Sequence, residues 1–122
     1  MIHEEICTYE VCKLAKEKGF NVDCEAFYYD DGFLQYAKFE NWNGRYINKF
    51  SAPTQSLLQR WLREEKGIII ELKYSDDTES FRPFWSWQIY NTLGITLEIG
   101  EPNTAYELAL EDALKYTLEN LV

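Results

Sequence analysis

Residues 51–72, SAPTQSLLQRWLREEKGIIIEL, constrain the fold more than any other part of the chain. Pro53 is followed by one apolar stripe at the 3.6-residue period of a helix, made of Leu57, Leu58, Trp61 and Leu62. Lys66 and Gly67 then supply the cation and the left-handed residue that commonly end a helix. The run 68–72 is rich in isoleucine. The stretch therefore predicts a helix that leads directly into a strand buried on both faces.

A chain of 122 residues suits a single domain, 1–122, with sub-layers at 1–50 and 51–122. Hydrophobic residues make up 46% of it and the net charge is −9, so we expect a folded acidic protein that repels phosphate backbones and anionic membrane surfaces. A partner with a basic or neutral surface is favoured. No long apolar run occurs, and acids stand near the start where a secretory signal carries Lys or Arg. We expect a cytosolic protein.

The three cysteines, Cys7, Cys12 and Cys24, have no CxxC spacing, and the one histidine is His3 near the start. A Cys/His metal site would lack ligands, and Cys–His catalysis would lack a fixed base. We therefore expect free, buried thiols, no metal and no cofactor.

In the first half, Thr8 can cap a helix over residues 9–18, which Gly19 would end. Two aromatic-rich runs, 24–29 and 33–39, flank an Asp-Gly turn and indicate a hairpin. Asn43-Gly44 offers a second tight turn before 45–50. The pattern favours a three-stranded antiparallel meander across residues 24–50.

The second half predicts strands at 68–74, 81–90 and 95–99, with Pro83 at an edge or a bulge. A capping box at residues 104–107 would then start the closing helix, whose apolar side holds Ala109, Leu110, Ala113, Leu114, Thr117 and Leu121. The predicted class is α+β, with antiparallel sheet or sheets, helices packed on one face and a C-terminal half of order αβββα. Whether the two β segments form one sheet or two stays open.

The order αβββα also occurs in domains that bind double-stranded RNA. Such binding requires lysines at the start of the last helix, where this chain has Glu107, Glu111 and Asp112. Direct nucleic-acid binding is therefore disfavoured.

Several blocks of the sequence resemble a family of small proteins of unknown function that phages and prophages of gut bacteria encode. The blocks are Lys18-Gly19-Phe20, Tyr28-Tyr29-Asp30, Ala52-Pro53-Thr54-Gln55 with Leu58, Trp61, Leu62, Arg63 and Glu64, then Trp87, and finally Tyr106-Glu107 with Ala109, Leu110, Ala113 and Leu114. The resemblance implies an origin on a mobile element. It implies no activity, cofactor or catalytic residue.

The run 81–90 contains the most distinctive candidate site. In a strand, Phe81, Trp85, Trp87 and Ile89 share one face, and Arg82, Phe84, Gln88 and Tyr90 share the other. The first face should pack under the helices. The second could stack a planar ligand and hold an anionic group, or could pack against residues 24–50.

Arg60 and Arg63 lie one helical turn apart and could clamp a carboxylate or a phosphate, or could form surface ion pairs with neighbouring glutamates. The acids at 30–31 and 76–79 lack the spacing of a calcium loop and are ordinary turn residues.

The sequence contains no nucleophile motif and no phosphate-binding glycine loop, so an enzyme is disfavoured. The favoured hypothesis is a non-enzymatic phage or prophage accessory protein in the host cytosol. It would bind a host protein, as a defence inhibitor or nucleic-acid mimic, through an acidic surface and exposed aromatics. The alternative is a protein that sequesters a nucleotide-like molecule against Arg82, Phe84 and Tyr90.

Overall fold

The structure is a computed structural model that describes residues 4–77 and 82–122. Along these residues the elements follow in the order α1 (Tyr9–Glu17), β1 (Cys24–Tyr29), β2 (Leu34–Glu40), α2 (Trp42–Arg45), β3 (Lys49–Ser51), α3 (Gln55–Lys66), β4 (Ile68–Asp77), β5 (Arg82–Asn91), β6 (Thr96–Ile99) and α4 (Tyr106–Asn120).

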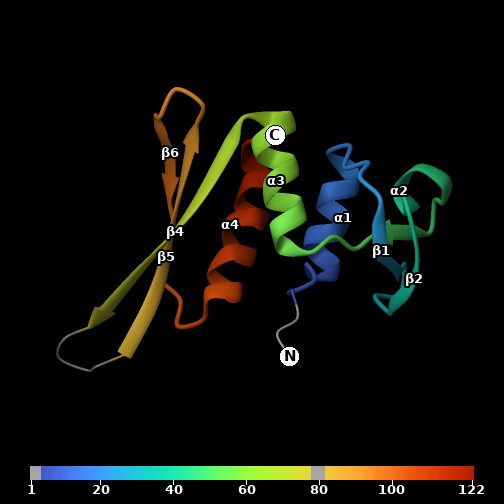
Figure 1. Cartoon of the computed structure of the whole chain (residues 1–122), viewed down its shortest axis with the longest axis horizontal. Coiled ribbons are helices and arrows are strands. Elements are labelled where there is room, and N and C mark those ends of the chain that lie inside the picture. The colour runs from blue at the N-terminus through green and yellow to red at the C-terminus, as the bar shows by residue number, and fades with distance from the viewer. Residues whose placement is uncertain (1–3, 78–81) are drawn as a thin grey trace.

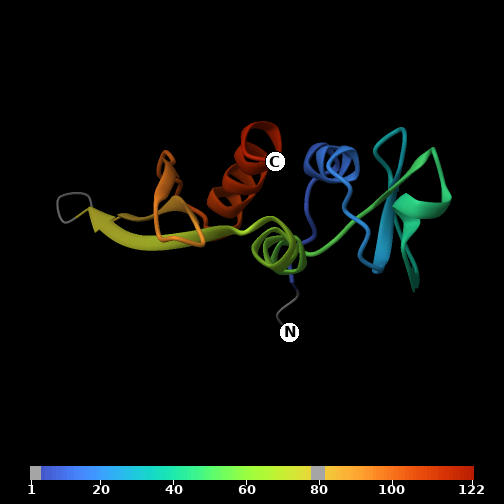
Figure 2. The same cartoon turned by 90° about the horizontal axis from the view of Figure 1, so that it is seen from above.

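The strands form two antiparallel sheets of three, in the orders β2-β1-β3 and β4-β5-β6. The helices α1, α3 and α4 lie between them, and the two sheets stand at opposite ends of the molecule (Figures 1 and 2). The α+β class and the αβββα order of the second half are confirmed. The two β segments form separate sheets, which the sequence left open.

The helix α3 ends where its sequence predicts, and it begins at Gln55, two residues after Pro53. Thr54 caps it by accepting a hydrogen bond from Leu57 N, and Gly67 ends it in the left-handed conformation with φ 66°. A strand follows α3 as predicted, but the prediction that it is buried on both faces is wrong, and β4 is an edge strand of its sheet. Ile68 and Ile70 are buried, whereas Ile69 on the opposite face is only half-buried.

The helix α1 and the β1–β2 hairpin also match the prediction. Thr8 caps α1, and Phe20 folds back after Gly19 so that its N–H reaches Ala15 O. The prediction of a meander is wrong. In a meander the third strand would pair with β2, whereas β3 pairs with β1 on the side away from β2. The Asn43 side chain accepts a hydrogen bond from Ser51 N, which holds residues 42–45 as a short helix in place of a two-residue turn.

The closing helix α4 forms without the predicted capping box. Ala105 is its N-cap residue, and its methyl side chain cannot accept a hydrogen bond. Asn103 exchanges two backbone hydrogen bonds with Trp85, which fixes the entry of the chain so that Ala105, and not Thr104, takes this position. Thr104 stays exposed. The predicted apolar side is buried at Ala109, Leu110, Ala113, Leu114 and Thr117, together with Leu118, which the sequence analysis missed.

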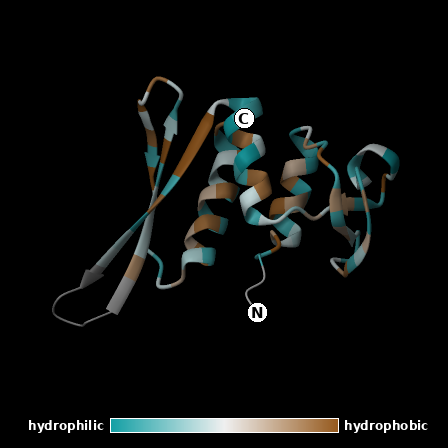
Figure 3. Cartoon of the chain, viewed as in Figure 1, coloured by the Kyte–Doolittle hydropathy of each residue, from teal (hydrophilic) through white to brown (hydrophobic). Residues whose placement is uncertain are grey.

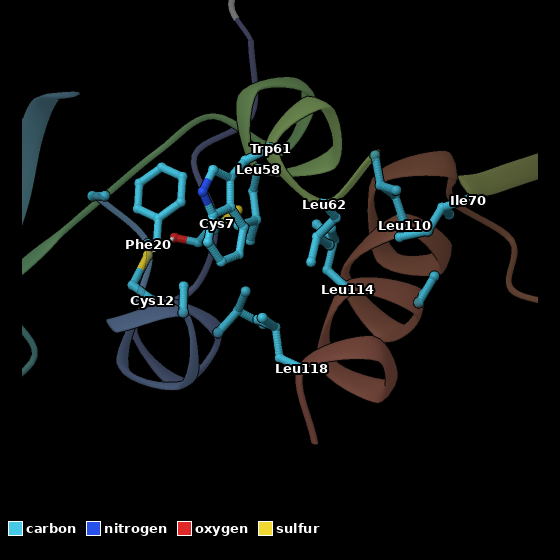
Figure 4. Close-up of a cluster of buried hydrophobic side chains, with 14 of the residues drawn as sticks. Cys7, Cys12, Phe20, Leu58, Trp61, Leu62, Ile70, Leu110, Leu114 and Leu118 are labelled. Atoms are coloured by element: carbon cyan, nitrogen blue, oxygen red, sulfur yellow. Dashed lines mark hydrogen bonds between the residues drawn. The ribbon is translucent and has the colours of Figure 1, made fainter. Parts of the chain in front are cut away.

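The core lies where the three long helices meet (Figure 4). Leu58 and Leu62 of α3 meet Leu114 and Leu118 of α4, and all four are fully buried. Figure 3 shows hydrophobic residues along α3 and α4 and at the start of β4. Trp61 is buried as predicted and packs edge-on against Phe20 at 5.3 Å between ring centroids.

A polar network at the edge of this core joins the same helices. The Glu111 carboxylate of α4 accepts hydrogen bonds from Thr8 N at 2.7 Å and from Gln55 Nε2 at 2.7 Å. Gln55 is buried and also donates to Glu107 O. One carboxylate therefore links the starts of α1 and α3 to α4.

The second sheet packs one face on α4, as the alternation in β5 predicts. Trp85 lies edge-on to Tyr106 at 5.0 Å, and Trp87 lies 5.6 Å from Tyr116. Ile89 is fully buried on the same face. The helix α3 lies beside α4 along the free edge of β4, where Gln59 Nε2 donates to Ile70 O. This packing turns the opposite face of the sheet outward.

Candidate functional site

The outward face of the second sheet carries most of the residues that the sequence analysis selected. The register sets Ile69 opposite Tyr90, Glu71 opposite Gln88 and Ser75 opposite Phe84. Directly opposed residues of antiparallel strands share a face. We call this surface the outer face; its residues are Ile69, Glu71, Lys73, Ser75, Phe84, Ser86, Gln88, Tyr90, Thr96 and Ile99.

Three of the four residues predicted for this face are described with their side chains. Phe84, Gln88 and Tyr90 are each half-buried within the sheet surface. For Arg82 only the backbone position in β5 is described, and Phe81 lies outside the described residues. The hypothesis that Phe84 and Tyr90 pack against residues 24–50 is wrong, because that sheet lies beyond the helices (Figures 1 and 2).

Two polar groups of the outer face are paired with each other. The Tyr90 hydroxyl and Gln88 Oε1 form a short hydrogen bond along β5. The phenol proton is therefore used inside the sheet and does not point toward a ligand. A flat surface of mixed apolar and polar side chains, in which the Tyr90 hydroxyl is already bonded, suits a protein partner better than it suits a small polar molecule.

The strand β6 extends the apolar part of this face, which the sequence analysis missed. Ile99 lies opposite Gln88 and is 60% exposed, and Leu97, at the register shift between the Glu98 and Thr96 pairs, is 37% exposed. The alternation of Ile95, Leu97 and Ile99 indicates an apolar face, but an alternating pattern does not say whether that face is covered.

Arg60 and Arg63 lie apart from the outer face. Both are exposed on α3, and Arg60 borders a surface hollow together with Val22 from the α1–β1 connection. Arg60 Nε donates to Glu64 Oε1 at 2.9 Å, an exposed ion pair one turn along the helix. This is the surface pairing that the sequence analysis kept as the alternative to an anion clamp, and it contributes little to stability.

An unpredicted aromatic cluster surrounds Lys49 on the far side of the first sheet. The ammonium Nζ lies 4.1 Å from the ring centroid of Tyr46, 4.6 Å from Phe27 and 5.3 Å from Trp42. Cations are attracted to the faces of aromatic rings at these distances. Since the rings come from β1 and the α2 region, Lys49 of β3 joins three elements, and its own ammonium occupies the space between them.

The three cysteines are free and buried, as expected. Burial raises the pKa of Cys24 to about 12, and the pKa values of Cys7 and Cys12 are raised well above their ordinary value for the same reason. The thiolate is the nucleophilic form of cysteine. These thiols are therefore held in the unreactive form at neutral pH.

We expect this burial to make the protein less stable in alkali. Burial also raises the pKa of Tyr28 to about 12. Between the ordinary thiol pKa of 9.0 and about 12, the unfolded chain loses protons that the folded chain keeps. The contribution of these groups to the free energy of unfolding should therefore be constant below this window and fall as the pH rises through it.

Urea unfolding at a series of pH values measures this fall, and a Cys24→Ala variant should show a smaller slope. As a second readout, a disulfide reagent such as DTNB at pH about 8 should label the thiols only after unfolding. Rapid labelling of the folded protein would contradict the burial of these groups.

The described residues were also compared with the requirements of a metal site and of a membrane-spanning helix. Among residues 4–77 and 82–122, no three His, Cys, Asp or Glu side chains gather to hold a metal ion. Asp31 instead accepts a hydrogen bond from Phe33 N in the hairpin turn. No described helix combines the length and the apolar character needed to cross a membrane.

Comparison of the chain with protein-family models, with curated proteins and with solved structures finds no match. A function has to be inferred from the geometry of the described residues.

Proposed function

We propose that this chain is a non-enzymatic protein-binding module whose outer face docks onto a host protein with a basic or neutral surface. The observation that carries the proposal is the group of apolar and aromatic side chains on the outward-turned face of the β4-β5-β6 sheet, namely Ile69, Phe84, Tyr90 and Ile99, of which Ile99 is 60% exposed. Exposed apolar patches rimmed by polar residues are typical of protein interaction sites. The resemblance to phage and prophage proteins supports the role of an accessory protein in the host cytosol.

The charge of the chain favours the stated partner. A net charge of −9 attracts basic surfaces and repels acidic ones over about one Debye length, or about 10 Å at 0.1 M salt. The outer face itself carries both Glu71 and Lys73. The acidic surface of the chain should therefore speed the encounter with the partner, and apolar contacts should hold the complex together. Added salt should slow binding without abolishing it.

The experiment uses one disruptive variant and one matched control. Ile99→Arg places a charge on the β6 side of the outer face, and Leu108→Arg places the same charge at a 56% exposed leucine on α4. We expect wild type and Leu108→Arg to capture the same protein from lysate of a gut bacterium, and Ile99→Arg to lose it. The captured protein, purified and remixed, should bind more slowly at about 0.5 M than at about 0.05 M salt.

Equal capture by the two arginine variants, or no partner at either salt concentration, would remove the proposal. The alternative, a nucleotide-like ligand against Arg82, Phe84 and Tyr90, is less favoured because the Tyr90 hydroxyl already bonds with Gln88. A thermal-shift screen with nucleotides separates the two functions, since a ligand site predicts stabilisation and a protein-binding face predicts none.

A further inference from the structure

The first sheet extends beyond the helix that covers it. Tyr9 of α1 packs on Tyr28 of β1 and on Phe50 of β3, with ring centroids 5.5 Å and 5.6 Å apart. The strand β2 lies on the other side of β1, at the edge of the sheet. Its aromatic side chains Tyr36 and Phe39 are 64% and 63% exposed. The sheet therefore overhangs the helical layer along β2.

A pocket of about 170 Å³ lies under this overhang. Tyr36 and Phe39 form part of its wall, and the rest is mostly apolar, with Ile6, Ala26, Ala52, Pro53 and Leu57 among the lining residues. An apolar cavity of about 150 Å³ can hold a benzene molecule. The pocket is therefore large enough for one apolar side chain and too small for a nucleotide-sized ligand.

The negative charge around the pocket favours a positively charged ligand. Asp23 and Glu25 are part of the lining, and no Lys or Arg is among the described residues that line it. Acidic groups beside an apolar floor complement a segment in which an apolar residue is flanked by cations.

The edge of β2 is free to pair with a further strand. Tyr29 N donates to Phe33 O in the hairpin, and hydrogen-bonded positions alternate from there, so Leu34 and Tyr36 direct their backbone groups away from β1. The carbonyl of Tyr36 accepts a hydrogen bond from the Gln35 side chain at 2.9 Å. A peptide N–H could take the place of that side-chain donor.

We propose that β2 and this pocket form a second binding site, which takes an extended basic peptide by strand addition. The peptide backbone pairs with the free edge of β2, and one apolar side chain enters the pocket between Phe39 and Leu57. Cationic side chains next to that anchor face Asp23 and Glu25. In this mode the backbone supplies affinity and the pocket supplies specificity. The site goes beyond the proposed function because it uses the other sheet.

The test uses a defined probe and the full chain. The probe is a fluorescein-labelled peptide of about nine alternating lysine and threonine residues, with one leucine at its centre. We expect saturable binding by fluorescence anisotropy. Alanine at the centre, glutamate for lysine, or N-methylation of alternate residues should each weaken binding by about tenfold or more.

Two phenylalanines of the hairpin supply a matched pair of variants. Phe39 lines the pocket and is 63% exposed, whereas Phe33 is 65% exposed and lies outside the lining. Because both are mostly exposed, Phe39→Ser and Phe33→Ser should both fold. We expect Phe39→Ser to weaken probe binding by about tenfold or more and Phe33→Ser to bind as wild type does.

Any of three binding results would overturn the site. They are no saturable binding, equal binding by the two serine variants, and binding that depends on lysine but not on the central leucine, which would be non-specific attraction. A dimer in sedimentation that only Phe39→Ser abolishes, without probe binding, would assign the β2 edge to a second copy of this chain and also overturn it. The Ile99→Arg variant should bind the probe normally, so failure of the outer-face proposal is distinguishable from failure of this one.

Discussion

Replacing Leu114 with alanine is expected to lower the free energy of unfolding by about 3 kcal/mol, or the melting temperature by about 10 °C. Leu114 is fully buried on α4, where it faces Leu62 of α3 (Figure 4). The truncation removes apolar contact and leaves a cavity between elements that cannot all move to fill it. Urea unfolding followed by far-ultraviolet circular dichroism measures the loss.

Leu108 is the matched control for this experiment. It lies on the same helix but is 56% exposed, so Leu108→Ala should change the free energy of unfolding by no more than about 0.5 kcal/mol. Equal losses in the two variants would mean that α4 does not bury the side that contacts α3. The packing between the two sheets would then have to be different.

The elements that the sequence predicts well are those with local signals. Thr8 and Thr54 each accept a hydrogen bond from the N–H three residues later, and Gly67 adopts the left-handed conformation that its helix end requires. A cap forms between residues that are neighbours along the chain. Such features can be inferred from a short window of sequence.

The errors occur where distant residues decide the local structure. Asn43-Gly44 is a good turn signal, but the side chain of Asn43 bonds with Ser51, and β3 then pairs with β1. Thr104 stands in a good capping pattern, but Asn103 is held by Trp85. Pairing between strands and contacts across the fold have no signature within one segment.

In the candidate site, too, local patterns could be predicted from the sequence and long-range packing could not. Alternation places Trp87 and Ile89 on one face of β5 and Gln88 and Tyr90 on the other, because a strand has a period of two. Which face α4 covers depends on packing across the fold, and so does the exposure of Ile99. The pocket beside Phe39 joins four segments of the chain, so no single stretch of sequence could have indicated it.

Gly100 is a further case, and its substitution should have the second large effect on stability. From the sequence it only ends a strand, but in the structure its N–H donates to Trp87 O and its Cα lies against the Trp87 indole. A Cβ at this position would overlap the ring atoms Cε2, Cζ2 and Nε1. Gly100→Ala should therefore cost about 3 kcal/mol, because the indole must leave its place beside Tyr116.

Two further variants isolate this cause. Gly94 has a positive φ of 77° and open space around it, so Gly94→Ala should cost only the backbone strain of about 1 kcal/mol. Trp87→Leu removes the obstructing ring, and adding Gly100→Ala to that variant should cost far less than it does in wild type. Strict additivity of the two changes in urea unfolding would show that the indole is not the obstacle, and the packing of β5 against α4 would lose its steric explanation.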